Sequence, residues 1–318
     1  MTTRIKLGVL DLVPVIAPAD PGFALEQAVH LAQQAEKWGY SRYWVAEHHD
    51  MPGLACTSPE VLLAHIGART QHIRLGSGAL LLPHYKPLKV AENFHMLATL
   101  YPGRVDLGIG RAPGGSAQVT IALSGNFLEN VRQLPTSLES LMALLNNQYE
   151  CEGQVVHARP LPATPPDVWL LGTNRKSAEF AAAYGTGYVF GQFMSDSDML
   201  EMLSVYRQSY QPSTASTVPR TLVAIGVICA PTDEEAQALA SAGVPWLQSA
   251  SKEETVHQLK EKTSYSERKV LIGSAESVKL QLEQLAQQCG IDEFLIVTPI
   301  PDYEKRLRSY ELLRTIAE

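Results

Sequence analysis

The sequence has few cysteines, and it has no cluster of them. Its four cysteines are spread over the chain, at Cys56, Cys151, Cys229 and Cys289. This spacing contains neither a CxxC pair nor a zinc-ribbon pattern. The cysteines therefore argue against a disulfide framework and favour a reducing compartment.

Long apolar runs and excess basic charge are absent as well. No stretch approaches the roughly 20 apolar residues that span a bilayer, and the apolar run near the N-terminus is too short for a signal peptide. Lys and Arg number 26 against 33 Asp and Glu, which gives a net charge of -7. This balance argues against a nucleic acid or an anionic membrane as partner. With 45% hydrophobic residues, the composition predicts a globular, cytoplasmic protein.

Strand-like and helix-like segments alternate along the chain, and this alternation predicts the fold. Eight short apolar segments have the character of strands: 5–11, 42–48, 73–82, 104–110, 167–172, 187–191, 220–230 and 293–298. Segments with helical spacing, such as 23–38 and 59–71, separate them. Eight such units predict an α/β protein with a TIM (β/α)8 barrel rather than a doubly wound sheet. We expect a single domain, 1–318, with insertions near 148–166, where a small hairpin fits, and 231–272.

Polar residues follow the second strand, at the end of the barrel where barrel enzymes have their active sites. Glu47, His48, His49 and Asp50 are consecutive there. Neighbouring residues of an extended segment point to opposite faces, so the two histidines do not easily share a metal ion, and we expect no metal. Two interpretations remain. One is a general base or hydrogen-bonding imidazole oriented by a carboxylate, and the other is a histidine pair that only completes the strand end.

A glycine-rich loop, GIGRAPGG at 108–115, follows the fourth strand. It does not fit a dinucleotide fingerprint, because its glycines are spaced GxGxxxG, Pro113 interrupts the turn, and no helix opens directly behind it. It is either a tight loop or a loop in which Arg111 points its guanidinium toward an anion in the barrel mouth.

A second loop with anion-binding character is GTNRKS at 172–177, between a strand and a helix. Thr173, Asn174 and Ser177 offer side-chain donors beside the free N–H groups of a helix N-terminus, which suits a phosphate. The alternative is ordinary helix capping. Because two such loops lie on neighbouring βα units, the sequence favours a phosphorylated cofactor.

Gly78 and Ala79 lie where the third strand meets the expected cavity. Such small residues allow a flat ligand to lie against the backbone. Simple packing inside the barrel explains them equally well.

Three motifs together resemble the bacterial-luciferase-like flavin monooxygenases, in particular their single-subunit, alkanal-monooxygenase-like branch. They are WVAEHH at 44–49, LGSGALLLPHYKPLKVAENFHMLATLYPGRVDLGIGRAPG at 75–114 and VWLLGTNRKSAEFAAAYG at 168–185. The resemblance is strong over residues 5–190 and weak beyond. It implies a TIM barrel that binds reduced FMN from a separate, transiently bound flavin reductase. With O2, the flavin would oxidise an aldehyde or another small organic substrate.

The resemblance also implies roles for individual residues. His48 is similar in position to a histidine implicated as catalytic base, with Glu47 beside it, and we expect His48 to be neutral. Gly78-Ala79 resembles a non-prolyl cis peptide that supports the isoalloxazine. Arg111 resembles an arginine that reaches the flavin phosphate, and Asn174 and Ser177 resemble the residues that donate hydrogen bonds to that phosphate. The implied cofactor-binding set is Gly78, Ala79, Arg111, Arg132, Gly172, Thr173, Asn174 and Ser177, in which Arg132 matches a second phosphate-binding arginine across a gap.

Two departures from luciferase argue against light emission. Gly110 stands where luciferase has a reactive cysteine, and Thr173 stands where it has a glutamate. Two other functions stay open on the same barrel: a deazaflavin-dependent reductase and a flavin-binding protein without turnover.

The resemblance further implies a homodimer formed by the helices at 59–71 and 88–101. Both helices carry apolar or small residues beyond one face, and a second apolar face needs a partner. These residues are Ala64, Ile66, Ala68, Ala91, Phe94, Met96 and Ala98.

Overall fold

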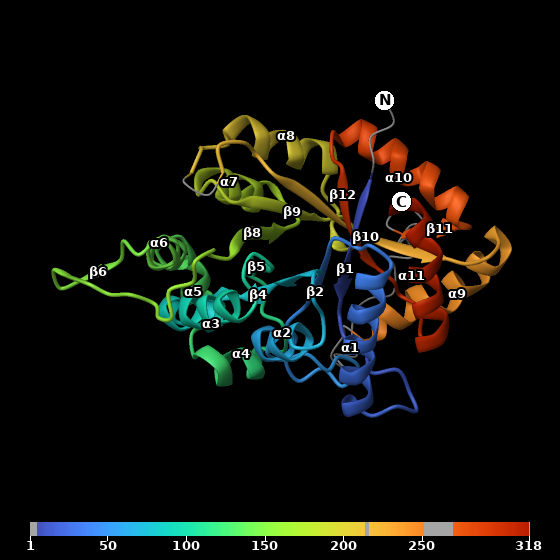
Figure 1. Cartoon of the computed structure of the whole chain (residues 1–318), viewed down its shortest axis with the longest axis horizontal. Coiled ribbons are helices and arrows are strands. Elements are labelled where there is room, and N and C mark those ends of the chain that lie inside the picture. Colours follow the sequence, from blue (N-terminus) through green and yellow to red (C-terminus); the bar gives the residue numbers. More distant parts are fainter. Residues whose placement is uncertain (1–4, 214–215, 251–269, 318) are drawn as a thin grey trace.

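A computed structural model describes residues 5–213, 216–250 and 270–317 (Figure 1). Its strands are β1 Lys6–Asp11, β2 Arg42–Val45, β3 Arg74–Ser77, β4 Leu80–Leu81, β5 Val105–Gly110, β6 Glu150–Cys151, β7 Gln154–Val155, β8 Asp167–Gly172, β9 Gly187–Gly191, β10 Thr221–Cys229, β11 Val270–Gly273 and β12 Glu293–Val297. Its α-helices are α1 Pro21–Lys37, α2 Pro59–Gly67, α3 Pro87–Leu100, α4 Ala117–Ser124, α5 Phe127–Arg132, α6 Leu134–Leu145, α7 Arg175–Ala183, α8 Met199–Ser209, α9 Asp233–Ala250, α10 Ala275–Cys289 and α11 Tyr303–Ala317. Two short 3-10 helices are η1 Leu82–His84 and η2 Gln192–Met194.

Eight parallel strands close into a barrel. The hydrogen-bonded order is β1-β2-β3-β5-β8-β9-β10-β12, and β12 pairs back with β1. Helices surround these strands (Figure 1). The predicted (β/α)8 barrel is therefore confirmed. Since all eight strands run the same way, the loops that follow them meet at one end of the barrel, which we call the carboxyl end.

The third predicted strand, 73–82, is divided into β3 and β4. The division falls at Gly78-Ala79, whose peptide bond is cis. A Cβ atom added at Gly78 would lie 2.5 Å from the side chain of Leu10 and 3.2 Å from that of Trp44. Packing inside the barrel, one of the two interpretations for this pair, therefore explains why position 78 is glycine.

The two predicted insertions differ in structure. Segment 148–166 contains the antiparallel hairpin of β6 and β7, which projects from the barrel in Figure 1, as predicted. Segment 231–272 contains α9 and most of a short strand that sequence reasoning missed, β11, which extends the sheet by pairing with the end of β10. Residues 251–269 of this segment lie outside the described residues. Within the described residues, no helix is both long and apolar enough to cross a membrane.

Most of the apolar residues nominated for a second face on α2 and α3 belong to the chain's own core. Ile66, Ala91, Phe94 and Ala98 are buried in the chain's own hydrophobic core and need no partner, so that expectation is wrong for them. Met96 is 51% exposed. Three large apolar residues that were not predicted for this face are also exposed, Val61 on α2 and Leu88 and Leu100 on α3.

Charged side chains meet at the amino ends of β2, β5 and β12, opposite the carboxyl end of the barrel. Arg42 donates to both Asp106 (2.8 Å) and Glu293 (2.7 Å). The indole N–H of Trp44 donates to Asp106 as well (2.9 Å), and Arg74 adds a further bond to the same carboxylate. Arg42, Asp106 and Glu293 are all buried. This amino-end ion network pairs each of the three charges with an opposite charge.

Candidate functional site

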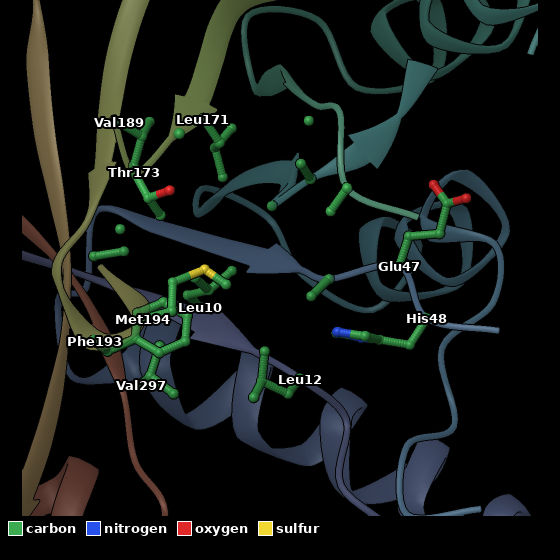
Figure 2. A pocket seen from close by; sticks show the side chains of 18 of the residues that line it. Leu10, Leu12, Glu47, His48, Leu171, Thr173, Val189, Phe193, Met194 and Val297 are labelled. Carbon is green, nitrogen blue, oxygen red and sulfur yellow. The ribbon is translucent and has the colours of Figure 1, made fainter. Parts of the chain in front are cut away.

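A cavity of about 570 Å³ opens at the carboxyl end of the barrel. Most of its walls are apolar, and Figure 2 shows Leu10, Leu12, Phe193, Met194 and Val297 close together on one side. These five residues come from β1, η2 and β12 and the positions directly after them. None of these five is among the predicted site residues. Leu12 and Val297 lie at strand ends, and this position in the sequence could have identified them.

Most of the predicted site residues line this cavity. They are Glu47, His48, Gly78, Ala79, Arg111, Gly172, Thr173 and Asn174. Loops that are distant in the sequence are thus brought to one place, as the (β/α)8 prediction requires. Ser177 and Arg132 are not among the lining residues.

His48 follows β2, and its imidazole points into the cavity (Figure 2). The backbone N–H of His48 donates to the carbonyl oxygen of Cys56 (2.9 Å). Its ring atom Nδ1 is buried and has no hydrogen-bond partner among the described residues. Burial, and secondarily the neighbouring His49, lower the pKa of His48 to about 4. The imidazole is therefore neutral at pH 7, as the sequence analysis expects.

Glu47 does not orient His48, which corrects the expectation that a carboxylate would do so. Figure 2 shows the two side chains pointing in different directions. The Glu47 carboxylate instead lies 2.8 Å from Nε2 of His49 and accepts bonds from the backbone N–H of Leu81 (2.9 Å) and the hydroxyl of Tyr85 (2.8 Å). Side chains alternate in direction along this extended segment, so His48 and His49 point to different sides. Glu47, two residues before His49, points to the same side as His49.

Arg111 reaches the N-terminus of α7. Its guanidinium donates to the side-chain oxygen of Asn174 (3.0 Å), which is the N-cap of that helix. A guanidinium beside a helix N-terminus combines a full positive charge with the positive end of the helix dipole. This part of the cavity is therefore suited to an anion.

Ser177 completes a capping box with Asn174. The Ser177 hydroxyl accepts from the backbone N–H of Asn174 (3.4 Å), and the Asn174 side chain accepts from the backbone N–H of Ser177 (3.3 Å). The capping interpretation is therefore confirmed for Asn174. Ser177 is buried and does not line the cavity, so it is connected to the cavity wall only through neighbours such as Asn174.

Arg132 lies away from the cavity. It is on the surface helix α5, its side chain is 78% exposed, and its guanidinium lies 3.4 Å from the carboxylate of Glu129 one turn earlier. The structure therefore does not bring Arg132 to the other predicted phosphate ligands. Within the described ranges, no three His, Cys, Asp or Glu side chains are grouped as metal ligands would be.

Comparisons with known proteins give one consistent result. The sequence matches the family described as luciferase-like monooxygenase over residues 5–293. It is 38% identical to the uncharacterised protein YceB of Bacillus subtilis, over 97% of this chain and 98% of that one. It is 33% identical to the N-acetyl-S-alkylcysteine monooxygenase of the same organism, over 97% of each. The solved structure of apo-MsnO8 superposes with a TM-score of 0.88 at 35% identity, over 98% of each chain.

Two more distant structures share the fold. The oxygenating constituent of 3,6-diketocamphane monooxygenase from Pseudomonas putida, in complex with FMN, has a TM-score of 0.72 at 19% identity, over 98% of this chain and 97% of that one. An F420-dependent secondary alcohol dehydrogenase has a TM-score of 0.65 at 16% identity, over 99% of each chain. At these identities the likeness concerns the fold alone.

Proposed function

The chain belongs to the luciferase-like monooxygenase family, and on this basis we propose that it is an FMN-dependent enzyme that uses reduced flavin and O2 to oxidise an aldehyde or another small organic substrate. The observation that carries the proposal is the cavity. One part offers a guanidinium at a helix N-terminus, and another presents a neutral imidazole among apolar side chains. The first suits a phosphate, and the second suits chemistry from which water is excluded.

The residues of the cavity fit FMN in three respects. Arg111 has five N–H donors, of which the contact with Asn174 uses one, so the guanidinium can also bind a phosphate. Gly78 and Ala79, which the cis peptide joins, line the cavity with no side chain larger than a methyl group, so a ring system can lie against the backbone there. The imidazole of His48 points into the cavity, where its edge can contact a bound group (Figure 2).

When bound, reduced FMN supplies the two electrons with which one atom of O2 enters the substrate and the other leaves as water. The chain's own contribution is to hold the phosphate with Arg111 and Asn174 and to exclude water with the apolar walls. His48 enters the reaction as neutral imidazole, so one ring nitrogen can accept a proton while the other donates a hydrogen bond.

The experiment is a coupled assay with a separate flavin reductase, NADH and a panel of aldehydes, ketones and thioethers. We expect substrate-dependent oxidation with FMN, and one atom of ¹⁸O from ¹⁸O2 in the product. Reduction of F420 with an alcohol, without O2 consumption, would replace the proposal with the deazaflavin alternative. Flavin binding without any product would favour the non-catalytic alternative.

We also propose a cytoplasmic homodimer that pairs through α2 and α3. The exposed large apolar residues that support it are Val61, Leu88, Met96 and Leu100, at 66%, 37%, 51% and 57% exposure. Light scattering at micromolar protein concentration is expected to give twice the chain mass. A monomeric mass at that concentration would refute the pairing.

A further inference from the structure

Glu47 is a buried carboxylate in the cavity wall with a complete set of partners. Its residue surface is 2% exposed. Oε2 accepts from the backbone N–H of Leu81 (2.9 Å), and Oε1 accepts from the hydroxyl of Tyr85 (2.8 Å) and lies 2.8 Å from Nε2 of His49. Three polar contacts of this kind satisfy a carboxyl group that would otherwise be costly to bury.

Two of these partners fix the wall that follows the cis peptide. Leu81 ends β4, two residues after Ala79, and its side chain lines the cavity. Tyr85 follows η1 directly, so Glu47 binds the segment on both sides of this short helix. Without Glu47, the N–H of Leu81 would be a buried donor with no acceptor in this position.

The third partner connects Glu47 to the loop that carries Arg111. The backbone N–H of His49 donates to the carbonyl oxygen of Gly114 (2.8 Å). The His49 ring packs edge-on against the ring of His84, with centroids 5.9 Å apart, and Nε2 of His84 lies 2.8 Å from the carbonyl oxygen of Pro113. The 111–114 loop is thus held at two successive carbonyls.

We infer that Glu47 is a positioning residue: it does not transfer a proton but fixes the Leu81 wall and the Arg111 loop in the geometry that binds the flavin. The inference rests on the proposed function, since it concerns the same site. It replaces the role of catalytic partner to His48 that the sequence suggests for Glu47.

The chemistry of Tyr85 agrees with this role. Burial, and then the neighbouring charge of Glu47, raise the pKa of Tyr85 far above its usual value. Its hydroxyl therefore stays protonated near pH 7 and can donate to Glu47. The bond to Glu47 is a permanent structural contact rather than a step in a proton path.

The test compares two substitutions at the same position, Glu47→Gln and Glu47→Ala. A glutamine can place its oxygen on the Leu81 N–H and its NH2 group toward Tyr85 and His49, both of which can accept. It thus keeps the contacts and loses the charge, whereas alanine loses all three. We expect FMN affinity within about tenfold of the wild type for Glu47→Gln and about 10²-fold weaker for Glu47→Ala, as expected for buried donors left unpaired.

Flavin oxidation rates separate positioning from proton transfer. At saturating FMN, we expect Glu47→Gln to lose less than about tenfold in rate, because an amide preserves the geometry. If both variants bind FMN normally and Glu47→Gln reacts as slowly as Glu47→Ala, Glu47 transfers a proton and the inference is wrong. Glu60→Gln is the matched control, because Glu60 is a nearby, partly buried carboxylate that is bonded to Asn93 and does not line the cavity.

Hydrogen exchange on the flavin-free protein tests the inference without relying on the proposed function. We expect faster amide exchange in residues 79–85 and 111–116 of Glu47→Ala than in the wild type, and wild-type exchange in Glu60→Gln. His84→Ala, which leaves Glu47 in place, should accelerate exchange in 111–116 only. Unchanged exchange in all of these segments for a folded Glu47→Ala protein would overturn the inference, whereas failure of the wild type to bind FMN would overturn the proposed function alone.

Discussion

The two ends of the barrel are built from the same strands but differ in how their polar groups are paired. β2 begins at Arg42, which is bonded to two carboxylates, and is followed by His48, whose Nδ1 has no partner among the described residues. β5 has Asp106 near its start, bonded to Arg42 and Trp44, and is followed directly by Arg111 at the cavity. At the amino end the charged side chains are paired with one another and hold the strands together. At the carboxyl end polar groups line a cavity in which a ligand can bind.

This difference predicts that substitutions at the two ends affect different properties. Changes at the amino end should lower the free energy of unfolding and leave flavin binding to the folded molecules intact. Changes at the carboxyl end should lower binding or turnover, with little effect on unfolding at neutral pH. The following predictions test this division, from the largest expected effect to the smallest.

The largest effect is expected for Arg42→Met. It leaves Asp106 and Glu293 buried without Arg42, and breaking one side of a buried ion pair costs about 3–5 kcal/mol of unfolding free energy. Urea denaturation measures this loss. Arg308→Met, in an exposed pair with Glu311, is the matched control and should change the free energy by less than about 0.5 kcal/mol. Equal losses in the two variants would refute the division.

A smaller effect on the free energy of unfolding is expected when the pH is lowered. The pKa of His48 is about 4 in the folded protein and near 6.5 in an unfolded chain. The unfolded state therefore binds protons more readily, so the stability present above pH 6.5 falls as the pH is lowered toward 4, by up to about 3 kcal/mol. In His48→Gln this part of the acid sensitivity should disappear. Identical pH profiles of unfolding for the two proteins would show that His48 is not held neutral by burial.

For Arg111→Ala we expect weaker FMN binding by about 1.5–3 kcal/mol, the contribution of a hydrogen bond to a charged group. The unfolding free energy should stay within about 0.5 kcal/mol, because Arg111 lies at the cavity surface. Isothermal titration with FMN and urea denaturation of the same sample measure both. Unaltered FMN affinity would remove Arg111 from the phosphate site.

The smallest effect is expected for Arg132→Ala. Its side chain is 78% exposed and contacts Glu129 on the same helix, so FMN affinity and stability should both remain near the wild-type values. A loss of FMN affinity comparable to that of Arg111→Ala would mean that α5 moves to the cavity when flavin binds, and it would restore the role that the family resemblance implies.

Much of the fold could be predicted from the sequence, because barrel strands are short apolar runs and helices show their spacing. The four-residue strand β11 was missed, since VLIG is too short to show any period. The burial of Ile66 and Phe94 also escaped prediction. Their neighbours on the helix are apolar on more than one side, so spacing alone does not say which side faces the barrel.

The sequence predicted which residues line the site better than it predicted the hydrogen bonds between them. The strand-end positions identified His48 and Arg111, because the fold collects these positions at one place. The contacts of Glu47 with Tyr85 and Leu81 depend on the path of the chain after β3, which leaves the strand at Gly78-Ala79. No spacing in the sequence encodes that path, so the role of Glu47 became visible only in three dimensions.

The most direct test of the account is His48→Ala, with melting temperature, FMN affinity and single-turnover oxidation measured on one preparation. Because His48 and Thr173, the neighbour of Asn174 in the sequence, lie on different sides of the cavity (Figure 2), we predict nearly intact FMN binding and a similar melting temperature. Oxidation should be slower by roughly 10²–10⁴-fold, the usual contribution of a positioned acid–base group. Near-normal oxidation together with early melting would show that His48 is a packing residue, and it would contradict the division between a structural and a reactive end of the barrel.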